Sequence, residues 1–134
     1  MRNALPLIWR KIKSRYNLMG SHCETCKKDY FPEKSICPTC RRKGKIVDKQ
    51  MPTEGKIVCF SKIHAAPKGF EHETPYFVAL IELTNGVRLF TMLVNAANDE
   101  VKIGQKAVMR FRKIFEDGEH GVIGYGYKFQ ALAK

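Results

Sequence analysis

Four of the five cysteines form two Cys-x-x-Cys pairs, Cys23 with Cys26 and Cys37 with Cys40, separated by ten residues. Each pair predicts a knuckle, a tight turn that directs two sulfurs at one point, and two knuckles complete a tetrahedral S₄ site. Soft thiolates favour zinc over magnesium or calcium, although iron in a rubredoxin-like site is a chemical alternative. Because four cysteines leave no open coordination position, we expect a structural ion rather than a catalytic one.

Two alternatives to the S₄ site involve the same cysteines. Two disulfides would need an oxidising compartment, whereas nothing in the first residues predicts a secretory signal. His22 adjoins Cys23 and could replace one thiolate as a ligand. The S₄ site remains the favoured interpretation, because Lys27 and Arg41 lie beside the pairs and favour the thiolate form.

No further group of residues predicts catalysis. The four histidines lie in no recognised catalytic pattern. Cys59 stands between Val58 and Phe60 in a predicted strand, where a thiol is usually a small core residue. The sequence therefore predicts a binding or structural protein and not a self-contained enzyme.

An amphipathic helix is predicted over residues 4–19, with Asn3 as its N-cap and Gly20 as its stop. Apolar residues recur at spacings of three and four and so share one face, which includes Trp9, Ile12 and Tyr16. This stripe could fold back onto the rest of the chain or dock on another protein. Trp, Tyr and Arg are enriched at interface hot spots, which favours docking and makes these three residues candidate partner-binding residues.

The chain divides into an N-terminal amphipathic helix (1–20), a rubredoxin-like zinc ribbon (21–50) and a barrel (51–134), and is mostly β. Period-two patterns predict five strands. They cover residues 56–64, 76–83, 87–94, 106–114 and 122–129. Asn85-Gly86 predicts a type I′ hairpin. Five antiparallel strands with a longer connection between the third and fourth favour a five-stranded OB-fold barrel, and a small SH3-like barrel is the competitor.

The positive charge is concentrated near the N-terminus. Residues 1–50 carry 13 Lys and Arg against 4 Asp and Glu, and residues 51–134 carry 11 against 9. A basic surface suggests an anionic partner, such as nucleic acid, a phosphorylated cofactor or an acidic protein face. No apolar run approaches the roughly 20 residues that span a bilayer, so we expect a cytoplasmic protein with no membrane partner.

The second and third predicted strands, residues 76–83 and 87–94, are apolar on both alternations. Continuous apolar strands predict burial on both faces. A barrel that binds single strands needs stacking platforms in a basic groove, and these strands supply only one Arg. Nucleic acid is therefore an unlikely partner, and a wall covered by another protein fits better; a single-stranded nucleic-acid binder is kept as the alternative function.

The order of motifs resembles the zinc-ribbon and OB-fold family known as domain of unknown function 35, which is associated with acyl-CoA enzymes. The resemblance covers nearly the whole chain. Its motifs are the helix with Trp9, Cys23-x-x-Cys26, Phe31-Pro32, Cys37-Pro38-x-Cys40, Glu54-Gly55-Lys56-Ile57-Val58, the strand from Pro75 to Leu83, Gly86-Val87-Arg88, and the segment from Val101 to Lys106.

The resemblance implies a non-catalytic accessory subunit of thiolase-type enzymes. The chain is similar to archaeal members, which would bridge acetoacetyl-CoA thiolase and hydroxymethylglutaryl-CoA synthase. Such a scaffold would pass acetoacetyl-CoA between the two enzymes at the start of the mevalonate route to isoprenoids. Coenzyme A would then be bound at the partner enzymes, and Zn²⁺ would be the structural ion of this chain.

Overall fold

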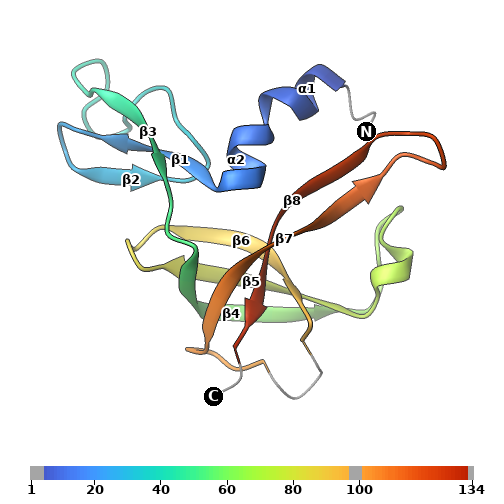
Figure 1. The fold of residues 1–134 in the computed structure, drawn as a ribbon. Coiled ribbons are helices and arrows are strands. Elements are labelled where there is room, and N and C mark those ends of the chain that lie inside the picture. Colours follow the sequence, from blue (N-terminus) through green and yellow to red (C-terminus); the bar gives the residue numbers. More distant parts are fainter. Residues whose placement is uncertain (1–4, 97–100, 133–134) are drawn as a thin grey trace.

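The computed structural model describes residues 5–96 and 101–132 and contains two β units below and beside a short helical segment (Figure 1). The first unit is a three-stranded sheet and the second is a closed barrel of five strands. The mostly β prediction, with a ribbon followed by a five-stranded barrel, is confirmed. Asn3, the predicted N-cap, lies outside the described residues.

The N-terminal segment contains two helices, α1 (Leu5–Arg10) and α2 (Ile12–Asn17), so the prediction of one helix over residues 4–19 is wrong. The helix is interrupted at Lys11, and α2 is followed by its C-cap, Leu18, which adopts a left-handed conformation with φ 51°. The turn at Leu18 buries its side chain completely. Burying a leucine stabilises by about 1.5–3 kcal/mol, which exceeds the roughly 1–2 kcal/mol cost of the left-handed backbone.

The ribbon is an antiparallel sheet with strand order β2-β1-β3. β1 spans Met19–Cys23, β2 spans Lys28–Tyr30 and β3 spans Ile46–Gln50. The first strand therefore begins at Met19, where the sequence pattern predicted the last turn of the helix. The central position of β1 places Cys23, its last residue, between both neighbouring strands, where it is fully buried.

The barrel has the strand order β4-β5-β6-β8-β7 and closes by pairing β4 with β7. The strands are β4 (Glu54–Ile63), β5 (Tyr76–Leu83), β6 (Arg88–Val94), β7 (Lys106–Glu116) and β8 (Ile123–Ala131). All neighbours are antiparallel except β6 and β8, which pair in parallel over a very short stretch. A 3-10 turn, η1 (Glu71–Glu73), lies in the connection between β4 and β5.

β5 and β6 each bury only one face, so the prediction of burial on both faces is wrong. Inward-facing residues such as Phe77, Ile81 and Leu93 belong to the barrel core. The outward-facing alternation remains partly or largely exposed, and Phe90 is 67% exposed. Burial within this chain therefore does not account for the apolar residues on the outer face of β5 and β6.

Two local predictions fail for backbone reasons. Gly86 has a positive φ of 80° but Asn85 does not, so the hairpin is a type I turn followed by a glycine bulge and not a type I′ turn. Cys59 is exposed, not buried in the core. A register shift between Ile57 and Cys59 changes the alternation along β4, so that Ile57 faces the core and Cys59 does not.

Candidate metal centre

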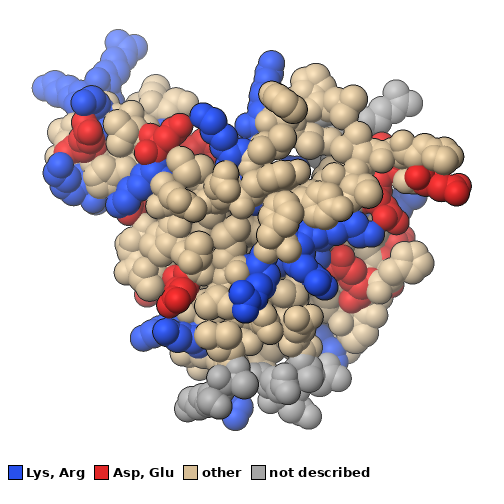
Figure 2. Space-filling view, viewed as in Figure 1, with Lys and Arg blue, Asp and Glu red and all other residues tan. Residues whose placement is uncertain are grey.

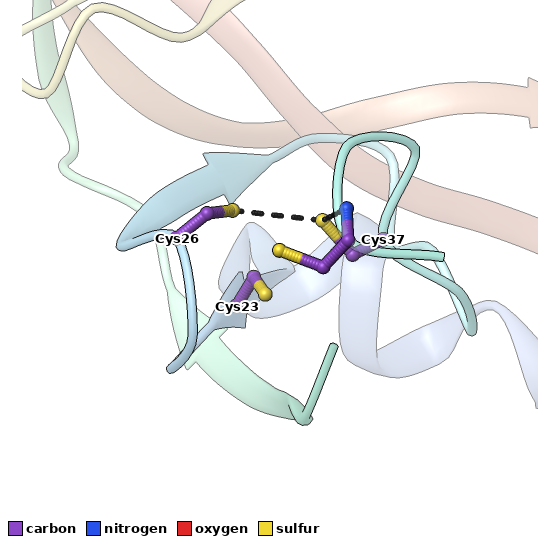
Figure 3. Close-up of side chains that lie close together, drawn as sticks. Cys23, Cys26 and Cys37 are labelled. Atoms are coloured by element: carbon purple, nitrogen blue, oxygen red, sulfur yellow. Dashed lines mark hydrogen bonds between the residues drawn. The ribbon is translucent and has the colours of Figure 1, made fainter. Parts of the chain in front are cut away.

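The four cysteine sulfurs lie within 4.8 Å of one another. Cys23 ends β1 and Cys26 lies in the turn before β2, whereas Cys37 comes from the facing loop, so the side chains converge from two sides (Figure 3). All four thiols are free. Sulfurs bound at about 2.3 Å in a tetrahedron are roughly 3.8 Å apart, so the arrangement fits a four-coordinate ion.

Both cysteine pairs adopt the same backbone turn. The Lys27 N–H donates to the Cys23 carbonyl, and the Arg41 N–H donates to the Cys37 carbonyl, each at 2.8 Å. Lys27 and Arg41 have positive φ values of 59° and 53°. A positive φ costs a non-glycine residue roughly 1–2 kcal/mol, so the two turns are strained in the same way and must be held by something outside themselves. A shared ion bound by both pairs would do so.

Tyr30 contributes to the cysteine cluster and was not predicted from the sequence. Its hydroxyl lies 3.3 Å from Cys37 Sγ, and the Cys40 N–H donates to the same sulfur at 3.4 Å. The Tyr30 hydrogen bond, followed by that of Cys40, lowers the pKa of Cys37 to about 6. Burial, followed by the neighbouring thiols, raises the pKa of Cys40 to about 12. The cluster thus favours some thiolate character, but four adjacent thiolates require a cation.

His22 is directed away from metal binding. Its Nδ1 is hydrogen-bonded to the Asp29 carboxylate, and the group of potential ligands comprises the four cysteines alone among the residues described. The alternation of β1 explains this, because adjacent strand residues point to opposite faces and Cys23 already faces the sulfurs.

Asp29 joins the ribbon to the barrel. Besides His22 of β1, its carboxylate accepts hydrogen bonds from Lys49 Nζ of β3 at 2.9 and 3.0 Å and from Asn85 Nδ2 at 2.8 Å. Asn85 belongs to the hairpin between β5 and β6 of the barrel. Burial alone would raise the pKa of Asp29, but the hydrogen bonds from Lys49, His22 and Asn85 together lower it.

The predicted partner-binding residues are not brought together. Trp9 on α1 is 78% exposed, whereas Ile12 and Tyr16 on α2 are partly buried. The Tyr16 ring packs edge-on against Phe111 of β7, with centroids 5.0 Å apart. Of the two outcomes left open by the sequence, folding back is observed for α2. Leu5, Leu7 and Trp9 of α1 remain exposed, and docking of this helix on another protein stays a prediction.

Exposed apolar residues also occur on the barrel, where the sequence did not predict them. Phe111 is 50% exposed and stacks on Tyr125 of β8 at 5.5 Å. These rings line a cavity of about 800 Å³ between the β7–β8 hairpin and η1, which also contains the Glu73–Lys128 ion pair. No signal in the sequence identified this pairing of rings, because it joins residues from separate strands.

The charged residues are distributed unevenly over the molecular surface. Figure 2 shows Lys and Arg at the ribbon end of the face, with some Asp and Glu among them, and Lys and Arg again across the centre; further Asp and Glu lie on the side of the barrel. The excess of Lys and Arg over residues 1–50 is therefore shared between the helical segment and the ribbon, since 8 of these 13 residues lie in the ribbon together with all 4 of the Asp and Glu. Among residues 5–96 and 101–132, neither helix reaches the length and hydropathy that crossing a membrane requires.

The comparisons with known proteins match both β units. Residues 10–45 match the family described as "ChsH2, rubredoxin-like zinc ribbon domain", and residues 48–112 match "ChsH2, C-terminal OB-fold domain". The chain is 44% identical over 124 residues to a "DUF35 domain-containing scaffold protein" of Methanocaldococcus jannaschii, covering 92% of this chain and 88% of that protein. The chain belongs to the DUF35 family.

Two further proteins similar to this DUF35 protein carry names that refer to enzymes. The chain is 29% identical to "Benzoylsuccinyl-CoA thiolase subunit BbsA" of Thauera aromatica, over 86% of this chain and 76% of that subunit. The solved structure "Ltp2-ChsH2(DUF35) aldolase" matches with a TM-score of 0.70 and 26% identity, covering 98% of this chain and 96% of that one. The predictions of the family and of an OB-fold barrel, as opposed to an SH3-like one, are confirmed.

Proposed function

We propose that this DUF35 protein is a non-catalytic scaffold that bridges acetoacetyl-CoA thiolase and hydroxymethylglutaryl-CoA synthase. In that role it would aid the transfer of acetoacetyl-CoA in the mevalonate pathway. The observation that carries the proposal is the 44% identity to a protein named as a scaffold, over nearly the full length of both chains. The name of the thiolase subunit BbsA supports an enzyme of the thiolase type as one partner.

Exposed apolar side chains support a docking role. Leu5, Leu7 and Trp9 on α1 are 63%, 52% and 78% exposed, and Phe90 on the barrel is 67% exposed. Exposed apolar patches of this kind mark interaction sites in soluble proteins. Trp9 would be the anchor, because a tryptophan in a desolvated pocket is a common interface hot spot. Ile12 and Tyr16 would act mainly by holding α2, and thereby α1, on the barrel.

Zn²⁺ is the proposed ion of the cysteine cluster, because a closed S₄ set suits zinc and leaves no position for a substrate. Bound zinc would neutralise part of the thiolate charge and hold the two knuckles together. Coenzyme A would be bound by the partner enzymes.

Co-expression of the tagged chain with the thiolase and the synthase from the same genome tests the scaffold. We expect a ternary complex in size-exclusion chromatography, and no thiolase–synthase complex when the chain is omitted. Acetoacetyl-CoA released into solution should be lower in the ternary complex than in a mixture of the two enzymes. A chain that elutes alone as a monomer would rule out the scaffold. An oligonucleotide titration at rising salt tests the alternative of nucleic-acid binding.

A further inference from the structure

One edge of β6 has no neighbouring strand along most of its length. β6 pairs with β5 over Arg88 to Leu93, but it pairs with β8 only through Leu93 and Val94. β8 is the next strand in the barrel, but its ladder with β6 does not extend to residues 88–92. An unpaired edge presents free N–H and C=O groups, which is a template for pairing with another chain.

The hydrogen-bond alternation shows which backbone groups face this edge. At the hairpin, the Leu83 N–H donates to the Val87 carbonyl at 2.8 Å. In an antiparallel pair, hydrogen-bonded and non-hydrogen-bonded pairs alternate from that point, so Leu89 and Thr91 exchange bonds with β5. The N–H and C=O groups of Phe90 and the N–H of Met92 therefore point away from β5, towards the open side. The Met92 carbonyl already accepts a hydrogen bond from the Thr91 hydroxyl at 3.3 Å.

Space is available beside these groups. A cavity of about 260 Å³ lies between β6 and β8, lined by Phe90, Met92, Gly126, Tyr127 and, from α2, Arg15. Gly126 allows α2 to pack closely on β8 at one side of this cavity, because a side chain there would meet Arg15 and Ile114. Phe90 is 67% exposed, so the cavity can be reached from solvent.

The charge of Arg15 favours an acidic ligand in this cavity. Arg15 lines the cavity, and no carboxylate of residues 5–96 and 101–132 lies within 4.0 Å of its guanidinium. Lys128, the other cation in the lining, is 4% exposed and already paired with Glu73. Arg15 is thus the cation available to a carboxylate placed beside β6.

We propose that the free edge of β6 accepts an extended, acidic and apolar segment of the thiolase-type partner as an added strand. Backbone groups of Phe90 and Met92 would pair with the segment, alternate apolar side chains would cover the two outward-facing residues, and an acidic side chain would meet Arg15. This inference rests on the proposed function, because it assumes assembly with that enzyme. Pairing with a second copy is disfavoured, because the chain carries a net charge of +11.

Hydrogen exchange of the purified chain and of its co-purified assembly with the thiolase tests the added strand. We expect a peptide spanning residues 88–94 to gain protection of two amides, because the alternate amides are already bonded to β5. An assembly without protection at β6 would overturn the inference while the scaffold stands. Failure to form any assembly would overturn the scaffold and, with it, this inference.

Two variant pairs separate backbone pairing from side-chain contact. Phe90→Pro removes both the ring and the outward N–H and should weaken assembly at least about 10-fold, whereas Phe90→Ala removes the ring but keeps that N–H and should weaken it about 2- to 3-fold. Arg15→Glu should weaken assembly about 10-fold, and Lys13→Glu, on the same helix but 79% exposed, should not. Thermal melts confirm folding of each variant. Equal losses for the two Phe90 variants, or for the two charge reversals, would contradict the added strand.

Discussion

Asp29 is the residue on which the two β units meet, and its role depends on partners from three elements. His22, Lys49 and Asn85 all donate to one carboxylate whose side chain is 9% exposed. Hydrogen bonds to a buried charge contribute more than those between neutral groups, because an unsatisfied charge in that position would be costly. The joint is therefore specific as well as stabilising.

Removing the barrel's contribution to this joint should weaken the fold. Asn85→Ala deletes the 2.8 Å hydrogen bond to Asp29 and should lower the free energy of unfolding by about 1–3 kcal/mol. Urea denaturation measures the change. Thr84→Ala, an exposed neighbour in the same hairpin, is the matched control and should stay within about 0.5 kcal/mol of wild type. A similar loss in both variants would point to the turn itself.

Acid should remove the contribution of Asp29. The pKa of this carboxyl is lower in the folded protein than in the unfolded chain, so the ionised form favours folding. Its stabilisation is complete above the unfolded pKa of about 3.9 and is lost as the pH falls through the lower folded value. The stability difference between wild type and Asp29→Asn should therefore be largest near neutral pH and shrink below about pH 4. Asp48→Asn, at an exposed position, should show little pH dependence.

Each ligand cysteine should be needed for the metal. Cys37→Ser should reduce bound zinc from about one equivalent to nearly none and unfold the ribbon, because three thiolates cannot close the S₄ site. Cys59→Ser is the control, since this thiol is exposed on the barrel and lies outside the cluster. Atomic emission on purified protein measures the zinc. Full zinc content in the Cys37 variant would refute the ligand assignment.

At the scale of elements, the break at Lys11 divides one amphipathic stripe between two environments. α2 packs through Tyr16 on Phe111, and Arg15 lies against Gly126. A side chain at Gly126 would place its Cβ only 3.5 Å from the Cβ of Arg15. α1 buries no residue. A single straight helix would have kept all of these side chains on one face, whereas the break allows α1 to leave the barrel surface.

This division predicts opposite effects for two aromatic truncations. Trp9→Ala should leave stability within about 0.5 kcal/mol but weaken enzyme assembly by about 2 kcal/mol or more. Phe111→Ala should lower the free energy of unfolding by about 1–3 kcal/mol, because it removes ring contacts to both Tyr16 and Tyr125. Thermal melts and affinity measurements with the thiolase separate the two effects. A destabilised Trp9 variant would show that α1 packs within the chain.

At the scale of the whole molecule, the two β units have different sources of stability. The barrel has its own core, which includes Ile57, Ile81 and Phe129. The ribbon has three short strands. Its buried residues are Cys23, Cys37 and Ser21, and Leu18 and Met51 are buried at its junctions with α2 and the barrel. Units this small need a metal or another constraint, so the ribbon should depend on its ion and the barrel should not.

Chelation should therefore unfold the ribbon and leave the barrel folded. A strong chelator should increase amide exchange throughout residues 19–50, while peptides from β5 and β6 remain protected. The expected physical cause is the loss of the S₄ site, since the barrel ladder contains none of its ligands. Hydrogen exchange with mass spectrometry measures both regions in one sample. Simultaneous loss of protection in the barrel would show that the units fold as one.

The sequence by itself determined the features that depend on local spacing. The four cysteines bring their sulfurs together because a Cys-x-x-Cys turn sets the geometry within a few residues, and the five barrel strands follow from period-two patterns. Only the tertiary structure decided the rest. Asn85 on Asp29 and the open edge of β6 depend on residues far apart in the chain, and Tyr30 beside Cys37 and the division of the helix depend on how neighbouring segments pack. Such contacts form because of packing and strand order, which no short stretch of sequence encodes.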